Sequence, residues 1–435
     1  MTAVHGWGRY PIVDAEIYSP IDTSGVAAAL KQAAYPVTSR GMGRSYGDSA
    51  LSDRIINCCD LKGITAFDFE AGTVRCGAGL TLSDLLTFTI PKGWFLPVTP
   101  GTKFVTVGGA IASDVHGKNH HLEGCFSESV DSFDLMLTAN EILTCSRNQR
   151  ADLFHATLGG MGLTGIIIEA TLRLKPISSS FIEQTTFKAR NLEEALHLFD
   201  THSNATYSVA WIDCLAAGPA MGRALLMLGE HSGFGGLSLP DKRPISVPFD
   251  FPTQTLNRFS IKAFNWLYYH RIREARSSQR VHYESFFYPL DSIHGWNRLY
   301  GKRGFLQYQF VIPREAGLEG LTTLLKRIVD SRRGSFLAVL KLFGKENQNL
   351  LSFPTEGYTL SVDFKLEDGL FELLDELDAI VLDYGGRIYL AKDARMKEAT
   401  FKRSYSRWIQ FQEVRSRYGV HKTFSSHQAQ RIGLN

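Results

Sequence analysis

Residues 97–121 combine glycines, short hydroxyl side chains, histidines and a lysine, a set suited to holding a phosphorylated ligand. Gly101, Gly108 and Gly109 have no Cβ, so the backbone can approach a ligand closely there. Thr102 adds a hydroxyl beside backbone N–H groups, which bind phosphate with little help from charged side chains. The stretch therefore predicts a phosphate or pyrophosphate site, in which the run GGAIA starts a short helix.

Two further glycine-rich loops lie at residues 41–47 and 159–165. All three loops fall between short predicted strands and helices, so their main chain could wrap around one extended ligand that carries phosphates. The first loop also contains Tyr46. This side chain suits either contact with an aromatic ring of a ligand or a core position with its hydroxyl hydrogen-bonded.

Residues 160–165 match the dinucleotide pattern GxGxxG, but their surroundings argue against a Rossmann site. That fingerprint requires a strand, then the glycines, then a helix. Here a predicted helix at 151–158 precedes the glycines and a predicted strand at 166–174 follows them. We therefore expect no Rossmann-type site, although these glycines could line the same ligand as the other loops.

Length and composition limit the class of protein. The chain has 435 residues, for which two domains are expected. A net charge of +3 gives no argument for nucleic-acid binding. The six cysteines form no CxxC pair, which favours reduced thiols over a disulfide framework. We see no signal-peptide pattern and no run of ~18 apolar residues, so we expect a soluble protein, cytoplasmic or peripheral at the inner membrane.

The order of predicted elements indicates an α+β protein. Alternation and turn residues predict strands at 35–38, 55–59, 64–69, 73–77, 132–139, 142–145, 166–174, 181–187, 206–213, 305–312, 336–343 and 358–365. Amphipathic spacing and N-cap residues predict helices at 22–34, from Thr81, and at 151–158, 192–202, 316–330 and 369–384. A strand from Arg387 and further helices close the chain. After a boundary at 175–180, strands and long helices predict one mostly antiparallel sheet with helices on one face.

Two segments of the second half are harder to interpret. Residues 236–254 are rich in Pro and Ser and predict a long surface loop. Residues 264–271, FNWLYYHR, predict an aromatic helix. That helix could contact a membrane or a lipid chain, or it could pack on its own domain, and the sequence leaves both open.

Gln307 and Gln309 lie two residues apart in a predicted strand, between apolar residues. Side chains two residues apart point to the same side of a strand. The two amides therefore share one face, which could bind sugar hydroxyls or face solvent.

Several longer motifs resemble the flavoprotein family of vanillyl-alcohol oxidase and p-cresol methylhydroxylase. The motifs are RGMGRSYGDSA, PGTKFVTVGGAIASDVHGKNHH, GGMGLTGIIIEATL, GWNRLYGKRGFLQYQFVIP, KLFGKENQNLLSFP and GGRIYLAKDAR. They cover nearly the whole chain except residues 215–280. The resemblance implies a two-domain fold, with an FAD-binding domain at 1–178, a substrate-binding domain built on an antiparallel sheet at 179–386, and a segment at 387–435 that returns to the FAD domain.

The resemblance also implies a cofactor, FAD, bound without a covalent link. The residues expected around it are Arg40, Gly41, Met42, Gly43, Arg44, Ser45, Tyr46, Pro100, Gly101, Thr102, Val105, Gly108, Gly109, Ala112, Ser113, His116, Gly117, Gly162 and Ile167. In this family His116 is expected to lie next to the flavin ring.

The resemblance further implies a chemistry, strongest for the subgroup that acts on polyprenylphosphoryl ribose. An alcohol oxidation needs a hydride acceptor and a base for the hydroxyl proton. Lys392 matches the family's lysine near flavin and substrate, with Tyr46 and His116 as the other catalytic candidates. The substrate residues implied are Lys118, Gln307, Gln309, Lys341, Ser361 and Lys392.

The expected reaction is oxidation of a ribose C2 hydroxyl to a 2-keto sugar, which a short-chain reductase would then reduce to the arabinose form. The alternatives are an oxidase of soluble sugars or aldonolactones, and a flavin-binding protein without activity.

His120 and His121 have two interpretations. Together with Cys125 they could bind zinc, or they could be hydrogen-bonded or surface histidines, which is the more frequent case. We expect no metal.

Overall fold

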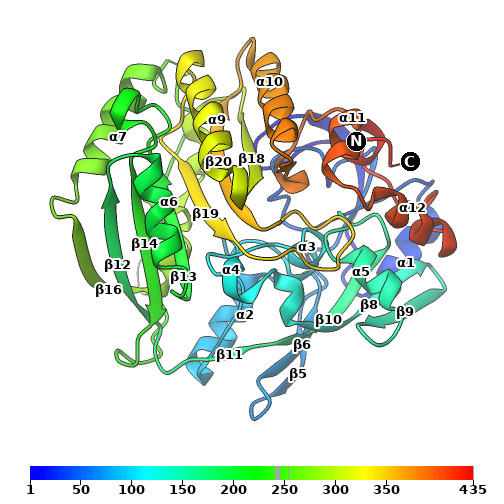
Figure 1. Cartoon of the computed structure of the whole chain (residues 1–435). Helices are drawn as coiled ribbons and strands as arrows, with labels where there is room; N and C mark the ends of the chain where they lie inside the picture. The colour runs from blue at the N-terminus through cyan, green and yellow to red at the C-terminus, as the bar shows by residue number, and fades with distance from the viewer. Residues whose placement is uncertain (241–244, 253, 435) are drawn as a thin grey trace.

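Two sheets form the first part of the chain, in a computed structural model that describes residues 1–240, 245–252 and 254–434 (Figure 1). One has the strand order β1-β2-β4-β3, with parallel pairing of β4 to β2 and β3. The other is antiparallel, in the order β5-β6-β10-β8-β9. The strands are Thr2–His5 (β1), Ile12–Tyr18 (β2), Thr38–Arg40 (β3), Arg54–Asn57 (β4), Ile64–Asp68 (β5), Thr73–Gly77 (β6), Val130–Thr138 (β8), Glu141–Ser146 (β9) and Ile166–Arg173 (β10).

Short polar residues begin three helices of this part. The side chains of Asp22, Thr81 and Thr106 accept hydrogen bonds from backbone N–H groups at the starts of α1, α2 and α3. Such caps satisfy donors that a helix otherwise leaves unpaired. The helices are Thr23–Gln32 (α1), Leu82–Thr89 (α2), Val107–Ala112 (α3), His120–Glu123 (α4) and Ala151–Thr157 (α5).

An eight-stranded antiparallel sheet forms the second part, in the order β16-β12-β14-β13-β19-β20-β18-β21. Helices α6, α9 and α10 pack together on one side of it (Figure 1). The strands are Phe181–Ala189 (β12), Tyr207–Ile212 (β13), Ala224–His231 (β14), Arg276–His282 (β16), Phe305–Pro313 (β18), Ala338–Phe343 (β19), Gly357–Lys365 (β20) and Arg387–Ile388 (β21). The helices are Leu192–Thr201 (α6), Arg258–His270 (α7), Tyr283–Phe287 (α8), Gly317–Ser331 (α9) and Leu370–Asp383 (α10).

Two short strand pairs complete the sheets. Trp94–Phe95 (β7) pairs with Lys175–Pro176 (β11), and Ile245–Ser246 (β15) pairs with Ile293–His294 (β17). The first pair lies where the two parts of the chain join.

The last segment of the chain packs against the first part. Helices α11 (Glu398–Ser404), α12 (Trp408–Arg417) and α13 (His427–Arg431) follow β21. Val37 N donates to Thr423 O (2.9 Å). The buried guanidinium of Arg415 donates to Leu163 O (3.0 Å), next to the third glycine loop. The chain end therefore supports two of the glycine loops.

Most predicted elements are present, with ends that differ by a few residues. The strand predicted at 35–38 instead spans Thr38–Arg40, and the strand from Arg387 ends already at Ile388. β14 and β16 were not predicted. β16 is an edge strand, polar on both faces, and β14 is a largely apolar run, so neither alternates clearly. The loop predicted at 236–254 includes residues 241–244 and 253, which lie outside the described residues.

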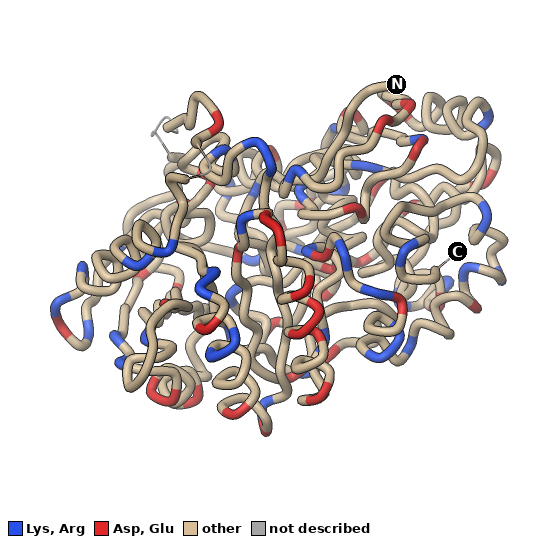
Figure 2. Tube along the Cα trace, turned by 90° about the horizontal axis from the view of Figure 1, so that it is seen from above, with Lys and Arg blue, Asp and Glu red and all other residues tan. Residues whose placement is uncertain are grey.

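Charged residues of both signs are interspersed along the trace (Figure 2). In residues 1–240, 245–252 and 254–434, no helix is both long and apolar enough to cross a bilayer. The helix predicted at 264–271 is α7, which begins earlier, at Arg258.

Candidate functional site

One cavity of about 810 Å³ is lined by both parts of the fold and by Tyr389, Ala391 and Lys392 of the last segment. Its lining includes every residue predicted to bind cofactor or substrate, except Gly117. A Cβ on Gly117 would lie 2.5 Å from Asn119 Oδ1, so this glycine permits tight packing behind the cavity wall. The sequence motifs therefore converge on one site.

The glycine loops meet at the cavity with no room for side chains at key positions. A Cβ on Gly41 would lie 2.3 Å from Thr106 Oγ1, so the first loop rests directly on the start of α3. Met161 N donates to Ala112 O (2.9 Å), which fixes the third loop to the end of the same helix. Gly162 has a φ of +77°, a conformation that favours glycine. The three loops thus form one continuous wall around α3.

The free backbone donors of this wall include those of the first loop, one of the segments expected to hold phosphate. The first N–H groups of α3 are already used: Val107 N and Gly108 N donate to Leu80 O and Ala78 O (2.8 Å each). By contrast, the N–H groups of residues 41–45 have no partner in the described part of the chain. A run of unpaired N–H groups forms an anion-binding concavity. The first loop, rather than the helix start, therefore offers the better phosphate site.

The two arginines of the first loop serve mainly to shape it. Arg40 donates to His5 O (2.7 Å) and Ala50 O (3.2 Å). The guanidinium of Arg44 stacks 4.1 Å from the Trp7 ring centroid and donates to a backbone carbonyl of the second loop. Both therefore add positive charge to the cavity while their hydrogen bonds hold the backbone.

The two glutamines of β18 face the cavity rather than solvent. Tyr308, between them, donates to Asp378 of α10 (2.9 Å), on the opposite side of the sheet. Gln307 Nε2 donates to Asp363 Oδ1 (2.6 Å) and to Tyr46 Oη (3.3 Å). The alternation of the strand thus places amides on the cavity side, as one of the two sequence interpretations held.

The antiparallel register of β20 adds polar groups to this face. Ser361 lies opposite Gln309, and Asp363 lies opposite Gln307. Thr359 receives a hydrogen bond from Gln309 Nε2 (3.2 Å). The side chains of two neighbouring strands therefore form one polar patch.

His116 lies in an aromatic part of the wall. Its ring centroid is 4.7 Å from that of Phe343 and 5.6 Å from that of Tyr389. Gln309 Nε2 donates to its Nε2 (3.1 Å). Burial lowers the pKa of His116 well below its usual value, and the neighbouring cation Lys341 lowers it further. His116 is therefore neutral, and its buried Nδ1 has no partner among the described residues.

Three partly buried lysines, Lys118, Lys341 and Lys392, line the same cavity. Burial lowers the pKa of Lys118 and of Lys341 to about 7, and each is lowered further by a neighbouring lysine. Lys118 donates to Phe286 O. Such amines are only partly protonated near neutral pH, so they can either accept a proton or bind an anion that restores their charge.

Lys392 lies in the 3₁₀ turn Leu390–Lys392, which follows the short strand β21. Tyr389 N donates to Gln309 O (2.9 Å), which anchors this turn to β18. The Lys392 Nζ is 4.2 Å from the Tyr46 ring centroid. Burial lowers the pKa of Lys392 to about 8, an effect that the Asp363 carboxylate opposes. Burial in turn raises the pKa of Asp363 to about 7.

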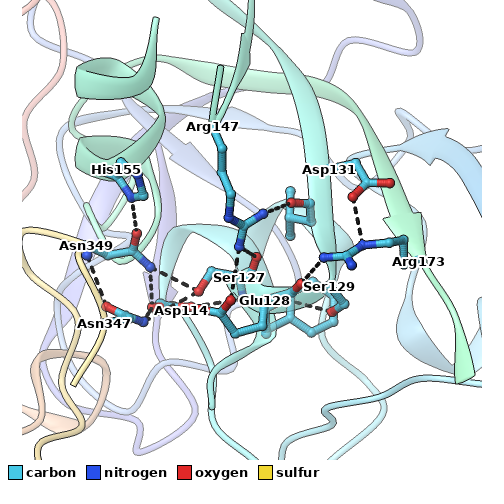
Figure 3. Close-up of polar contacts among 12 residues, drawn as sticks. Asp114, Ser127, Glu128, Ser129, Asp131, Arg147, His155, Arg173, Asn347 and Asn349 are labelled. Atoms are coloured by element: carbon cyan, nitrogen blue, oxygen red, sulfur yellow. Dashed lines mark hydrogen bonds and ion pairs between the residues drawn. The ribbon is translucent and has the colours of Figure 1, made fainter. Parts of the chain in front are cut away.

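Asp114 lies between α3 and His116 in the chain and takes part in the polar contacts drawn in Figure 3. It is fully buried, has a φ of +38°, and accepts hydrogen bonds from several donors. They include Asn347 and Asn349 Nδ2 (2.8 Å each) and Ser352 Oγ (2.7 Å), all in the connection between β19 and β20. The carboxylate thereby joins the second glycine-rich stretch to the sheet that carries the glutamines.

The zinc interpretation of His120 and His121 receives no support from the geometry. His120 Nδ1 accepts from Gly344 N (3.2 Å), and His121 Nε2 lies 2.9 Å from Ala205 O. The described residues contain no group of three His, Cys, Asp or Glu placed to hold a metal ion. Both histidines connect the glycine-rich stretch to the second part of the chain.

Several lining residues were not predicted. Those of the first part include Trp7, Ser39, Ala50 and Cys58, and those of the second include Gln184, Trp211, Met227, Tyr268 and Arg271. The apolar residues of the second part resemble core positions, and only their place on the sheet shows that they face a cavity.

We predict that Asp114→Asn destabilises the protein by about 2 kcal/mol, because an amide directs N–H donors at groups that themselves donate. Thermal unfolding of purified protein measures this. Asp131→Asn is the matched control, since Asp131 is partly exposed and pairs with Arg173 (2.8 Å). Its effect should stay below about 1 kcal/mol. Equal effects of the two substitutions would contradict the positioning role of Asp114.

Comparison with known proteins agrees with this geometry. Residues 16–146 match the FAD binding domain family. Decaprenylphosphoryl-beta-D-ribose oxidase of Mycolicibacterium smegmatis is 37% identical over 99% of this chain and 97% of that enzyme. L-gulonolactone oxidase of Mus musculus is 31% identical, over 41% of this chain and 40% of that enzyme. D-lactate dehydrogenase of Anaerostipes hadrus is 29% identical, over 45% of this chain and 42% of that enzyme. The chain therefore belongs to the FAD-dependent oxidoreductases of the vanillyl-alcohol oxidase and p-cresol methylhydroxylase family, with an α+β two-domain fold, in the group of the decaprenylphosphoryl-β-D-ribose oxidases.

Proposed function

We propose that this FAD-dependent oxidoreductase oxidises the C2 hydroxyl of a polyprenylphosphoryl-β-D-ribose to the 2-keto sugar. The observation that carries the proposal is the meeting of three lysines and two glutamines at one side of a cavity whose other side is formed by glycine loops. The near full-length similarity to an enzyme named for this substrate supports it.

The residues of the cavity fit FAD. The unpaired N–H groups of residues 41–45 suit its pyrophosphate, and the tight packing at Gly41 allows the backbone to come close. The unpaired Nδ1 of His116 leaves one donor free at the aromatic end of the wall. When bound, FAD supplies the acceptor for the hydride that leaves the alcohol carbon.

We assign the cofactor contacts to the lining residues of the three glycine-rich segments and of β10. They are Arg40, Gly41, Met42, Gly43, Arg44, Ser45, Tyr46, Pro100, Gly101, Thr102, Val105, Gly108, Gly109, Ala112, Ser113, His116, Gly162 and Ile167.

Lys392 is the proposed base for the C2 hydroxyl proton. A pKa of about 8 leaves part of this amine unprotonated near neutral pH, and its position over the Tyr46 ring holds it inside the cavity. Tyr46 and His116 flank the reacting region as neutral groups, since burial raises the pKa of Tyr46 well above its usual value. Their proposed role is to orient the ring and the substrate.

The polar patch on β18 and β20 is the proposed sugar site. Gln307, Gln309 and Ser361 offer amides and a hydroxyl for the ribose hydroxyls. Lys118 and Lys341 are the proposed ligands of the substrate phosphate, because a phosphate would restore the charge that burial disfavours. The apolar wall around Trp211 and Met227 is left for the lipid chain.

The wider arrangement is part of the same proposal. We divide the chain into an FAD-binding domain (1–178), a substrate-binding domain (179–386) and a returning segment (387–435), whose short strand β21 pairs with β18 of the substrate-binding sheet. A 2-keto product calls for a reductase, of the short-chain type, to give the arabinose form.

A polyprenyl substrate resides in lipid, so contact with a membrane surface is also proposed.

The test of substrate class is anaerobic reduction of the yellow protein by each candidate substrate. The loss of flavin absorbance measures the reduction. We expect polyprenylphosphoryl ribose to bleach the flavin, whereas free sugars and aldonolactones leave it oxidised. Bleaching by a lactone or by free ribose at an equal rate would favour the alternative sugar or aldonolactone oxidase. A protein that binds FAD and is bleached by none of these would lack the proposed activity.

We predict that acid precipitation releases FAD into the supernatant. Cys58 lines the cavity, but burial raises the pKa of its thiol to about 12, so it is a poor nucleophile toward the flavin. Absorbance of the supernatant and the pellet checks this. Flavin that remains with the pellet would establish a covalent link.

We predict that Lys392→Ala keeps its FAD but loses ~10²–10⁴-fold in the rate of flavin reduction.

In the parent protein the rate of flavin reduction should rise as pH rises through about 8, since the unprotonated amine of Lys392 is the active form. Asp363→Asn should move that rise to lower pH, because the carboxylate is what raises the pKa of Lys392. Stopped-flow reduction across pH 6–10 measures both effects. An unmoved profile in Asp363→Asn would remove Asp363 from this electrostatic role.

A further inference from the structure

Helix α7 presents an apolar stripe to solvent. Phe259, Trp266 and Leu267 are 68%, 53% and 62% exposed. Spacings of seven and eight residues place them on one side of the helix, and the exposed Ala263 lies between them. The stripe is therefore continuous along most of the helix.

The inward side of α7 is firmly attached to the protein, so its orientation is fixed. Asn265 is buried and donates to Asp213 Oδ1 (2.8 Å). Tyr269 donates to Ala189 O (3.1 Å). This inward side packs against the sheet. The apolar residues of the outward stripe are therefore not core residues that have been exposed by a wrong orientation of the helix.

The other two long helices of this part differ in what they expose. The exposed residues of α9 include Glu319, Lys326 and Asp330, and those of α10 include Glu372 and Glu376. A surface helix of a soluble domain normally shows such charged residues to water. Exposed aromatic and aliphatic residues along one helix instead indicate a surface that binds something apolar.

Basic residues outnumber acidic ones in the segment that contains α7. Residues 254–282 contain six basic residues, Arg258, Lys262, Arg271, Arg273, Arg276 and Arg280, and one acidic residue, Glu274. Arg258 and Lys262 lie on α7 itself, both exposed, with Arg258 4.5 Å from the Phe259 ring centroid. An apolar stripe flanked by cations matches the headgroup region of an anionic bilayer.

The same helix also lines the cavity. Tyr268 and Arg271, at the end of α7, are lining residues, and the Tyr268 ring centroid lies 4.7 Å from that of Trp211. In Figure 1, α7 lies at the outer end of the second part, far from α12. A bilayer held against the stripe would therefore adjoin the apolar end of the cavity.

We propose that the α7 face, defined as Phe259, Ala263, Trp266 and Leu267 with Arg258 and Lys262, binds the surface of an anionic phospholipid bilayer. The helix lies in the plane of the interface, with aromatic residues among the headgroups and cations beside lipid phosphates. This deepens the proposed function and, for its relevance to a polyprenyl substrate, rests on it. The binding itself does not depend on turnover.

The test is flotation of the FAD-loaded protein with vesicles of phosphatidylglycerol and phosphatidylcholine, compared with vesicles of phosphatidylcholine alone. We expect binding to the anionic vesicles to be roughly tenfold or more stronger, and to weaken as salt rises. Trp266→Ser/Leu267→Ser should lower it by at least roughly tenfold. The control Leu318→Ser/Ile409→Ser changes two similarly exposed residues outside α7 and should bind as the parent does.

Flavin content and the unfolding midpoint establish that each variant is folded. Equal binding of parent and α7 variant, or no binding by the parent, would overturn the proposal. The proposal would also be overturned if, without lipid, the parent protein were a dimer and the α7 variant a monomer. That result would assign the α7 face to contact with a second copy of the chain. With substrate dispersed in detergent, the α7 variant should be reduced at the parent rate. If the substrate in detergent fails to reduce the flavin of the parent protein as well, the proposed function is contradicted. The result with vesicles is unaffected by that outcome.

Discussion

The placement of three partly buried lysine side chains in one cavity is the constraint on which the site depends. Lys118, Lys341 and Lys392 each have a pKa lowered by desolvation, and the charge of one disfavours the charge of the next. Such a cluster is costly unless anions enter it or protons leave it. The site is therefore prepared both for a phosphorylated ligand and for a base, and one electrostatic arrangement supports both properties.

That cluster needs a rigid frame, which the antiparallel sheet and the glycine loops supply from opposite sides. The register of β18 with β20 brings Gln307 to Asp363 and Gln309 to Ser361, while the turn that carries Lys392 is anchored on β18. Asp114 then joins this sheet to the stretch that carries His116 and Lys118. Hydrogen bonds between segments far apart in sequence thus determine which polar groups meet.

Much of this arrangement could be predicted from the sequence, because it follows local rules. Period-two alternation placed Gln307 and Gln309 on one face, and short polar caps marked α1 and α2. Asp114 could not be recognised, since a buried aspartate satisfied by distant asparagines has no local pattern. The glycine loops were expected around the phosphates, but only the fold shows that Leu80 O and Ala78 O already pair with the first N–H groups of α3 while those of residues 41–45 stay free among the described residues.

The support that the chain end gives to the glycine loops has a consequence for how the protein forms. Tyr46 N donates to Ala391 O (3.1 Å), Arg431 pairs with Asp48 (2.7 Å), and Arg415 holds Leu163 O. These contacts join residues separated by some hundreds of positions, so they close late in folding. During synthesis the first glycine loop emerges long before its partners do. The contacts that hold the cofactor cradle are therefore completed only after residues up to Arg431 have been made.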